Sequence, residues 1–513
     1  MGMRLWGAVK QRVLLSNVPV KKGQHMIKNP EEETLDPENW DEMQQLGHAM
    51  VDVMFDFLKN QRAKPVWSIP PPEVKAFLSR PLPQDPEGYQ SAFMDFVKYV
   101  LPYGKGNVHP RFWAWVEGAG TPFGMLAEML AAGMNSNLSL GDHAPIYLEH
   151  QVLDWIKEFL QFPKSASGIL VSGGSVANLT GITVGRNNFS KLDIRNDGVL
   201  SANSQLITYG SRETHNSIEK ALEILGMGSK SFRKIDVLDN YTIDLDQLER
   251  EIAQDIKKGN IPFCIIGNIG TVNTGAIDPL AKLSGIAKRE GLWFHVDGTF
   301  GAYAAVVPEY ADRIKGLWDA DSLALDLHKW MSMPYEVGCV LINNKTLHKN
   351  AFTQSAEYLM RHERGIGAGP DSFNNYGIQL SRGFRALKVW LSIKEHGAKK
   401  HKRIIAQNIS QCFYLEKIIK TQAKLELITP VTLNIVCFRY RGLKLDKEKL
   451  NILNKEIVMT LHEMGIAAPS FTILNGQYCI RVGNVNHRSK TADFDLFVRS
   501  VIEIGDRLSN NFI

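Results

Sequence analysis

The sequence predicts an α/β protein whose largest part is a mostly parallel sheet covered by helices on both faces. Between residues 165 and 344, short apolar runs alternate with segments of helical periodicity, as in repeated strand–helix units. Apolar residues make up 44% of the 513 residues and charged residues 22%, which favours a large buried core over a disordered or fibrous chain. Because single cores stop growing at about 250 to 300 residues, we expect more than one domain.

Each expected strand is a short apolar run, and each expected helix repeats apolar residues at a spacing of three or four. Near-continuous apolar strands are typical of parallel sheets that are buried on both faces. The expected strands lie at 169–171, 205–209, 263–267, 292–296, 322–325 and 338–342, and the helices between them at 176–187, 217–225, 245–257 and 279–290.

The segment before this region is expected to form a helical arm. Residues 37–57 have helical spacing, and a proline-rich connector at 68–83 surrounds a short helix at 73–78. Such a stiff, extended piece cannot bury much of its own apolar surface, which suits an arm laid across another subunit.

The segment after residue 344 has a different pattern, typical of a small α/β domain. A helix is expected from 382 to 396, ended by Gly397, and after it strands at 433–440 and 478–482 accompany helices at 447–464 and 492–508. We therefore expect a basic N-terminal extension at 1–28, an N-terminal helical arm at 29–110, a large domain at 111–380 and a small C-terminal domain at 381–513.

The charge of the chain is mild and unevenly spread. Its 59 basic and 54 acidic residues give a net charge of +5, which is too small for a dedicated binder of nucleic acid or anionic membranes. Six basic and no acidic residues lie in the first 28, which leaves 53 basic and 54 acidic residues in the rest. This extension could be a basic amphipathic helix or a transit peptide, but we favour a disordered extension or an upstream start with Met26 as a second candidate.

The cysteines and the hydropathy pattern point to a soluble protein of the cytoplasm. The five cysteines are scattered singly and form no C-x-x-C pair, which favours reduced, buried thiols over disulfides or a zinc site. No apolar run approaches the ~18 residues that a membrane-spanning helix needs, so we expect no integral membrane segment.

A turn of small residues at 171–175, Val-Ser-Gly-Gly-Ser, leaves one expected strand and opens the next helix. Glycines let backbone amides approach a ligand, and a helix N-terminus offers unpaired amide hydrogens to an anion. The turn matches neither the Walker pattern nor G-x-G-x-x-G. It predicts a phosphate site, unless Gly and Ser serve a purely steric role.

Two residues at expected strand ends carry reactive side chains. Asp297 shares a strand face with His295, and a buried acid there needs a cationic partner to stay ionised. His-x-Asp could belong to a metal site, but no further ligand cluster accompanies it, so we expect no metal. Lys329 follows the strand at 322–325; desolvation lowers the pKa of such an amine and makes it nucleophilic toward an aldehyde, whereas the alternative is a surface lysine.

The phosphate turn, Asp297 and Lys329 are together the parts that pyridoxal 5'-phosphate requires. Its aldehyde bonds to a lysine, its ring nitrogen stays protonated beside a carboxylate, and its phosphate needs backbone donors. His215 follows the strand at 205–209 and could stack on the cofactor ring or simply begin a helix. We expect this cofactor at the carboxyl ends of the strands, where open α/β sheets bind ligands.

Four motifs occur in order along the chain: Ser172-Gly173-Gly174-Ser175, Gly-Thr-Val-Asn-Thr-Gly-Ala-Ile-Asp at 270–278, His295-Val296-Asp297 and His328-Lys329-Trp330. With them the sequence resembles the pyridoxal-phosphate-dependent decarboxylases related to aromatic L-amino-acid and glutamate decarboxylases. That family has the aspartate-aminotransferase fold, or fold type I. The resemblance runs from about residue 37 to the C-terminus and implies a homodimer.

The resemblance implies roles for single residues. Lys329 corresponds to the Schiff-base lysine, Asp297 to the partner of the pyridinium nitrogen and His215 to the ring-stacking residue. The other residues implied in cofactor binding are Gly174, Ser175, Thr271 and His328.

Tyr358 resembles a tyrosine that the family carries on a mobile loop, often contributed across the dimer. Its phenol could protonate the substrate carbon after carbon dioxide leaves, which favours simple decarboxylation. Related aldehyde synthases tend to have Phe at this position. The alternative for Tyr358 is an aromatic side chain packed in a loop.

Four residues resemble the substrate wall: Phe112, Trp113, Trp115 and Val116. They suggest an aromatic or large apolar substrate side chain, although a plain core has the same composition. The chain departs from the family at Asp326, where aromatic amino-acid decarboxylases commonly have Asn, and at Val272, where a second Thr is frequent. An extra carboxylate near a phosphate is unfavourable unless it is protonated or turned away, so the resemblance carries no phosphate role onto Asp326.

We therefore expect decarboxylation of an L-amino acid to its amine and carbon dioxide. Aldehyde synthesis or transamination with the same cofactor is one alternative. A catalytically silent scaffold of the same fold is the other, and the intact Lys329, Asp297, His215 and Tyr358 argue against it.

Overall fold

The computed structural model describes residues 33–199, 204–354, 362–442 and 445–510. The chain divides into two compact units, Met1–Asp52 and Val53–Ile513. Helix α1 (Trp40–Lys59) begins in the first unit, with Asp41 and Glu42 in the first turn, where the helix dipole favours negative charge. The expected basic extension at 1–28 lies outside the described residues.

Short helices follow α1 along the chain, in the stretch where the sequence predicts a proline-rich connector. Pro72 opens α2 (Pro72–Phe77), since the missing N–H of proline costs nothing at the start of a helix. After α3 (Tyr89–Asp95), the Tyr99 ring stacks on Phe77 with centroids 3.9 Å apart.

The larger sheet has seven strands and is mostly parallel, as expected. Its order is β2-β8-β7-β6-β5-β3-β4, and only the two pairings of β8 are antiparallel. The short edge strand β4 is missing from the sequence prediction because Arg233 and Lys234 interrupt its apolar run. The strands are β2 (Ser167–Val171), β3 (Leu206–Ser211), β4 (Phe232–Ile235), β5 (Ile261–Asn268), β6 (Trp293–Asp297), β7 (Ser322–Asp326) and β8 (Gly338–Ile342).

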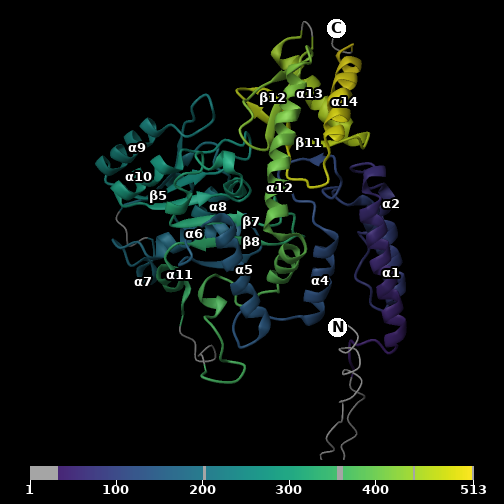
Figure 1. Cartoon of the computed structure of the whole chain (residues 1–513), viewed down its shortest axis with the longest axis horizontal. Coiled ribbons are helices and arrows are strands. Elements are labelled where there is room, and N and C mark those ends of the chain that lie inside the picture. Colours follow the sequence, from purple (N-terminus) through teal and green to yellow (C-terminus); the bar gives the residue numbers. More distant parts are fainter. Residues whose placement is uncertain (1–32, 200–203, 355–361, 443–444, 511–513) are drawn as a thin grey trace, which may run out of the picture. The chain divides into compact units, whose positions relative to one another are not determined.

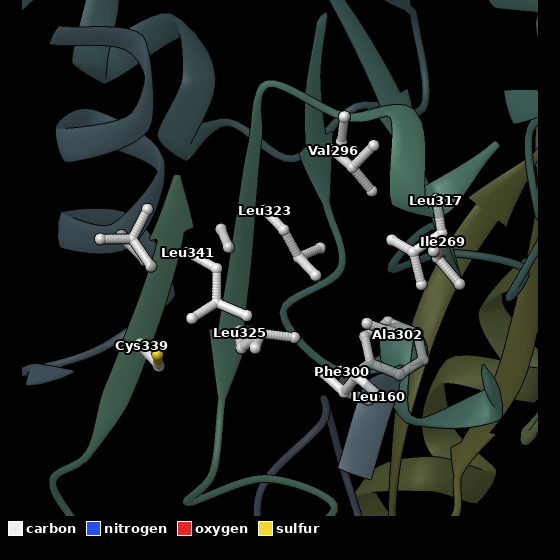
Figure 2. Close-up of a cluster of buried hydrophobic side chains, with 14 of the residues drawn as sticks. Leu160, Ile269, Val296, Phe300, Ala302, Leu317, Leu323, Leu325, Cys339 and Leu341 are labelled. Carbon is white, nitrogen blue, oxygen red and sulfur yellow. The ribbon is translucent and has the colours of Figure 1, made fainter. Parts of the chain in front are cut away.

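Helices cover both faces of this sheet (Figure 1). On β5, Ile265 packs in the cluster that contains α9 and α10, whereas its neighbour Ile266 packs with α6 and α8. Figure 2 shows Leu323 and Leu325 of β7 among the buried side chains of the main core. The helices are α4 (Pro122–Met134), α5 (Ala144–Leu160), α6 (Gly174–Asn187), α7 (Ile194–Asp197), α8 (Ser217–Ile224), α9 (Leu245–Lys257), α10 (Leu280–Glu290) and α11 (Lys345–Phe352).

The smaller sheet has five strands in the order β1-β11-β12-β10-β9, with α13 and α14 packed against it. Strand β1 pairs with β11, so residues 112–113 join the C-terminal sheet although the sequence predicts the large domain to start at 111. These elements are β1 (Phe112–Trp113), β9 (Leu425–Leu427), β10 (Ile435–Tyr440), β11 (Ala468–Leu474), β12 (Gln477–Gly483), α13 (Lys447–Glu463) and α14 (Thr491–Ser509).

The long helix α12 (Ala386–Lys420) packs against both groups of elements. Its first part lies against α4 and α5, and its later part lies against β9, β10 and α14 (Figure 1). Gly397 interrupts it with φ 68° and ψ 154°. The sequence predicts that a helix ends at this glycine; in the structure the glycine breaks a helix that continues beyond it.

Two expectations from composition concern the whole chain. The five cysteines are buried and free, as predicted. Among the described residues, no helix has both the length and the apolar character to cross a bilayer.

Candidate active site

The carboxyl ends of β2, β3, β5, β6 and β7 meet at one edge of the larger sheet, because β2 is antiparallel to β8 and therefore runs in the same direction as β7. Two adjoining cavities open there and share His215, Thr299 and Lys329. We call the cavity of about 280 Å³ lined by Trp115, Asp297 and Thr271 the ring cavity. The cavity of about 350 Å³ lined by residues 172–176 is the phosphate cradle.

A larger cavity of about 660 Å³ lies beside α6, α7 and α11. Its described lining contains neither Lys329 nor Asp297. Because the reactive groups predicted from the sequence gather elsewhere, we take the two adjoining cavities as the active site.

The phosphate cradle is shaped by the start of α6. A Cβ added at Gly174 would lie 2.4 Å from Cγ2 of Thr299, so no larger residue fits there. Ser172, Ser175 and His328 also line this cavity. The open amides at the N-terminus of a 14-residue helix attract an anion, which agrees with the phosphate site expected from the sequence.

Asp297 is the last residue of β6 and is 6% exposed. Nδ2 of Asn178 donates to its Oδ2 at 3.0 Å, and the backbone N–H of Thr299 donates to its Oδ1 at 3.2 Å. These donors hold the carboxylate in place where it lines the ring cavity.

Asn178 is itself held by the buried ring of His295. Its Nδ2 donates to Asp297, so its Oδ1 is the acceptor for Nε2 of His295 at 2.9 Å. Trp293 Nε1 donates to Oγ of Ser322, whose hydroxyl can then donate to Nδ1 of His295 at 2.7 Å. Burial lowers the pKa of His295 to about 4, so this ring is neutral, as the network requires.

Lys329 lies in the turn after β7, and its Nζ donates to Oδ2 of Asp326 at 2.7 Å. A Cβ added at Gly118 would lie 1.9 Å from the carbonyl oxygen of His328 and 2.6 Å from that of Lys329. Only glycine permits this close approach, which places the segment after Trp115 against the lysine turn.

His215 and Thr271 follow β3 and β5, and both line the ring cavity. Nδ1 of His215 accepts a hydrogen bond from the backbone N–H of Ser217 at 3.2 Å. Burial lowers the pKa of His215, which keeps its ring neutral at pH 7. Thr271 Oγ1 accepts from the backbone N–H of Ala276 at 3.2 Å, which fixes the loop after β5.

Trp115 and Val116 line the ring cavity, but Trp113 does not lie with them. Trp113 is buried in the C-terminal core, where its ring stacks on Phe494 with centroids 4.7 Å apart and its Nε1 donates to Oγ of Ser489. This placement corrects the expectation for Trp113, because β1 turns that side chain toward the smaller sheet.

Five further residues of the ring cavity are absent from the sequence prediction: Glu117, Asn268, Thr299, Phe300 and Tyr335. The Tyr335 ring lies against that of His328 with centroids 4.3 Å apart and the ring planes tilted by 34°, and burial raises the pKa of Tyr335. Glu117 forms an ion pair with Lys105, whose Nζ also lies 4.3 Å from the centroid of the Trp115 ring.

Of the site residues absent from the sequence prediction, Asn178 could have been found from the sequence. Asn178 lies four positions after Gly174, so on the expected helix it shares a face with the cradle glycine. Tyr335 and Phe300 carry no such local signal. Tyr358 lies outside the described residues.

Arg481 of β12 connects the smaller sheet to this site. Its guanidinium donates to the carbonyl oxygens of Trp115 and Val272, each at 2.8 Å. Burial lowers its pKa to about 10, so it remains charged at neutral pH.

The residues present fit pyridoxal phosphate. A glycine cradle that a single Cβ would fill, a buried acid held by two donors and an amine surround connected cavities. These are the groups that bind the phosphate, the ring nitrogen and the aldehyde of this cofactor.

Comparison with known proteins agrees with this chemistry. A family model described as the pyridoxal-dependent decarboxylase conserved domain matches residues 71–441. The aromatic-L-amino-acid decarboxylase of Bacillus atrophaeus is 33% identical over 476 residues, which cover 92% of this chain and 97% of the relative. The phenylacetaldehyde synthase of Arabidopsis thaliana is 28% identical over 466 residues, which cover 89% of this chain and 94% of that protein.

Among solved structures, the tryptophan decarboxylase of Catharanthus roseus in complex with L-tryptophan is similar with a TM-score of 0.82 and 25% identity. The match covers 92% of this chain and 100% of that chain. The protein described here therefore has the fold of the pyridoxal-phosphate decarboxylases, as the resemblance implies. Since the family model spans most of the sequence and a 33% identical relative is matched almost end to end, the chain belongs to the pyridoxal-dependent decarboxylases.

Proposed function

We propose that this pyridoxal-phosphate-dependent decarboxylase acts on an aromatic L-amino acid and releases the corresponding amine and carbon dioxide. The observation that carries the proposal is the wall of the ring cavity. Trp115, Phe300 and Tyr335 line the same cavity of about 280 Å³ as Lys329 and Asp297. Aromatic walls favour aromatic side chains, since ring stacking adds about 0.5–1.5 kcal/mol to the burial of apolar area.

Pyridoxal phosphate, when bound, supplies an aldehyde that links to amines and a protonated ring that withdraws electrons from the carbon bearing the carboxylate. In our proposal Lys329 holds the cofactor covalently and Asp297, oriented by Asn178, keeps the ring nitrogen protonated. The amides at residues 172–175 bind the phosphate. The neutral ring of His215 covers one face of the cofactor ring.

The fate of the substrate carbon depends on a proton donor, and we assign this role to Tyr358. A phenol that delivers a proton to this carbon completes simple decarboxylation. Without a donor, molecular oxygen can attack instead, and the products are aldehyde, ammonia and hydrogen peroxide. Because one relative is named phenylacetaldehyde synthase, aldehyde formation is the alternative outcome that the experiment must distinguish from decarboxylation.

The assembly and location are also proposals. We infer a homodimer, because the family resemblance implies a loop tyrosine that reaches the site across the dimer. We infer a cytoplasmic location from the five scattered, free cysteines.

A panel of L-amino acids tests the substrate proposal. We expect tryptophan, tyrosine, 3,4-dihydroxyphenylalanine or phenylalanine to release carbon dioxide and the amine at least about fivefold faster than glutamate, because the cavity wall offers aromatic contacts worth about 1 kcal/mol or more. Turnover is measured as carbon dioxide, with the amine, aldehyde and peroxide quantified in parallel.

The control is Lys329→Ala, which should abolish turnover together with the visible absorbance of lysine-bound cofactor. Faster release from glutamate than from every aromatic substrate would refute the proposed substrate class. Peroxide and aldehyde in place of the amine would refute simple decarboxylation.

A further inference from the structure

The phosphate cradle contains a group that the proposed function does not use, the carboxylate of Asp326. This residue ends β7, is 2% exposed and lines the cradle. Its Oδ2 lies 2.7 Å from Nζ of Lys329 and 3.6 Å from Nε2 of His328. Its Oδ1 has no hydrogen-bond partner within the described part of the chain.

Gly174 of the cradle and Gly338 at the start of β8 place this carboxylate beside the site of an anion. A Cβ added at Gly174 would lie 2.8 Å from Oδ2 of Asp326, and one added at Gly338 would lie 2.9 Å from Oδ1. The carboxylate therefore lies at the first turn of α6, where open amides attract negative charge. A phosphate bound there has a buried carboxylate as its neighbour, and like charges in a buried site repel strongly.

Among the described residues that line the cradle, Lys329 is the only lysine or arginine. Lys329 neutralises Asp326 when no cofactor is bound. With the cofactor aldehyde bonded to Lys329 and one water molecule released, the nitrogen would carry at most one positive charge, which would have to serve a phosphate dianion as well. His328 adds no charge at pH 7, because burial lowers its pKa.

We propose that Asp326 takes up one proton from solvent when the cofactor phosphate binds, and that the neutral acid donates a hydrogen bond to a phosphate oxygen. The proton removes the repulsion and gives this side chain a donor that the carboxylate lacks. Asparagine, common at this position in aromatic amino-acid decarboxylases, carries a donor at every pH. Asp326 is thus a positioning residue for the phosphate, an inference that requires the cofactor but not the proposed substrate.

The other titratable side chains around Asp326 do not change protonation between pH 7 and 8.5. Burial lowers the pKa of His215 and His328, so both stay neutral. Burial raises the pKa of Tyr303 and Tyr335, so both keep their protons. Two charged groups complete the surroundings: Lys329, and the half-exposed Glu336, which pairs with Arg385 at 3.0 Å.

The test compares the dissociation constant of pyridoxal phosphate for the full-length chain and for Asp326→Asn between pH 7.0 and 8.5. In this range the phosphate is already a dianion, since its second pKa is about 6. We expect the ratio of wild-type to variant dissociation constant to rise about tenfold per pH unit, because one proton is linked to binding in the wild type alone. Glu336→Gln is the matched control, since it removes an ion-paired, half-exposed carboxylate from the same cavity and should keep the wild-type slope.

Parallel curves for wild type and Asp326→Asn would show that Asp326 stays ionised and would overturn the proposal. A second measurement needs no variant. Calorimetric titration of the wild-type chain at pH 8, in two buffers of different ionisation enthalpy, counts the protons taken up with pyridoxal phosphate and with pyridoxal. We expect about one more proton with the phosphorylated compound, and equal uptake would contradict the inference.

Discussion

At the scale of single residues, Asn178 connects Asp297 to the buried ring of His295. One face of its amide orients Asp297, and the other receives the proton of the neutral ring of His295. Because the residue is fully buried on α6, no water can replace either contact without a rearrangement of the core. The carboxylate of Asp297 is therefore oriented by a residue of α6 and not by a side chain of its own strand, β6.

Asn178→Ala should weaken cofactor binding by about 10- to 100-fold, because a hydrogen bond to a charged group contributes about 1.5–3 kcal/mol. The measurement is the dissociation constant of pyridoxal phosphate at pH 7.5. Asn187→Ala is the matched control, since Asn187 lies on the same helix but donates to the carbonyl oxygen of Ala351. Equal cofactor affinity in both variants would show that Asn178 does not orient Asp297.

Much of the site could be predicted from residues that follow apolar strands. Lys329, Asp297, His215 and Thr271 follow or end such runs, and the structure brings all four to the ring cavity. Trp113 and Trp115 could not be told apart, because which side of the chain faces the cavity depends on the pairing of β1 with β11. Arg481 reaches the site only through tertiary packing, whereas the helical spacing of Asn178 from Gly174 is a local signal.

At the scale of elements, α12 depends on one unusual glycine. Gly397 has φ 68° and ψ 154°, a region that side-chain-bearing residues rarely occupy, and no atom lies within 4 Å of the place where its Cβ would be. The break therefore reflects backbone conformation and not crowding. It lies between the part of α12 that packs on α5 and the part that packs on β10.

Gly397→Ala should lower the free energy of unfolding by about 1–3 kcal/mol, the usual cost of such a conformation for a residue with a side chain. Urea unfolding of the full-length protein measures the change. Gly285→Ala in α10 is the control: it also has free space, but no positive φ, so we expect a gain of about 0.4–1 kcal/mol. A gain at both positions would contradict the assigned strain.

The same elements show what sequence patterns can reveal about the fold. The six expected strands of the larger sheet are all present, since buried parallel strands are continuous apolar runs. The strands absent from the prediction lie outside that pattern. β4 carries Arg233 and Lys234, β1 has two residues and β9 has three, and β11 alternates buried residues with the exposed Phe471 and Ile473.

At the scale of the whole molecule, buried neutral histidines link stability to pH. Burial is the main cause in each case, and an unfolded histidine has a pKa of about 6.5. The unfolded chain therefore binds more protons than the folded chain as the pH falls below 6.5, so folding loses free energy in that window. The pKa is lowered to about 4 for His109, His295, His401 and His487 and to about 3 for His348.

We expect the free energy of unfolding to be nearly constant above pH 7 and to fall between about pH 6.5 and 4, with each of these histidines adding up to about 1.4 kcal/mol per pH unit. Urea unfolding at pH 7.5, 6.0 and 5.0 measures the slope. His348→Asn should lower this slope by the contribution of one proton. His348 contacts Ser167 and Tyr376, away from both cavities, so the variant leaves the active site unchanged. An unchanged slope in this variant would contradict the role of His348.

The guanidinium of Arg481 makes one part of the ring-cavity wall depend on the smaller sheet. Because it donates to the backbone oxygens of both Trp115 and Val272, its loss would release two segments of that wall at once, whereas Asp297 is held by the pairing of β6 with β7. The smaller sheet therefore sets the shape of the cavity, and the larger sheet holds the acid.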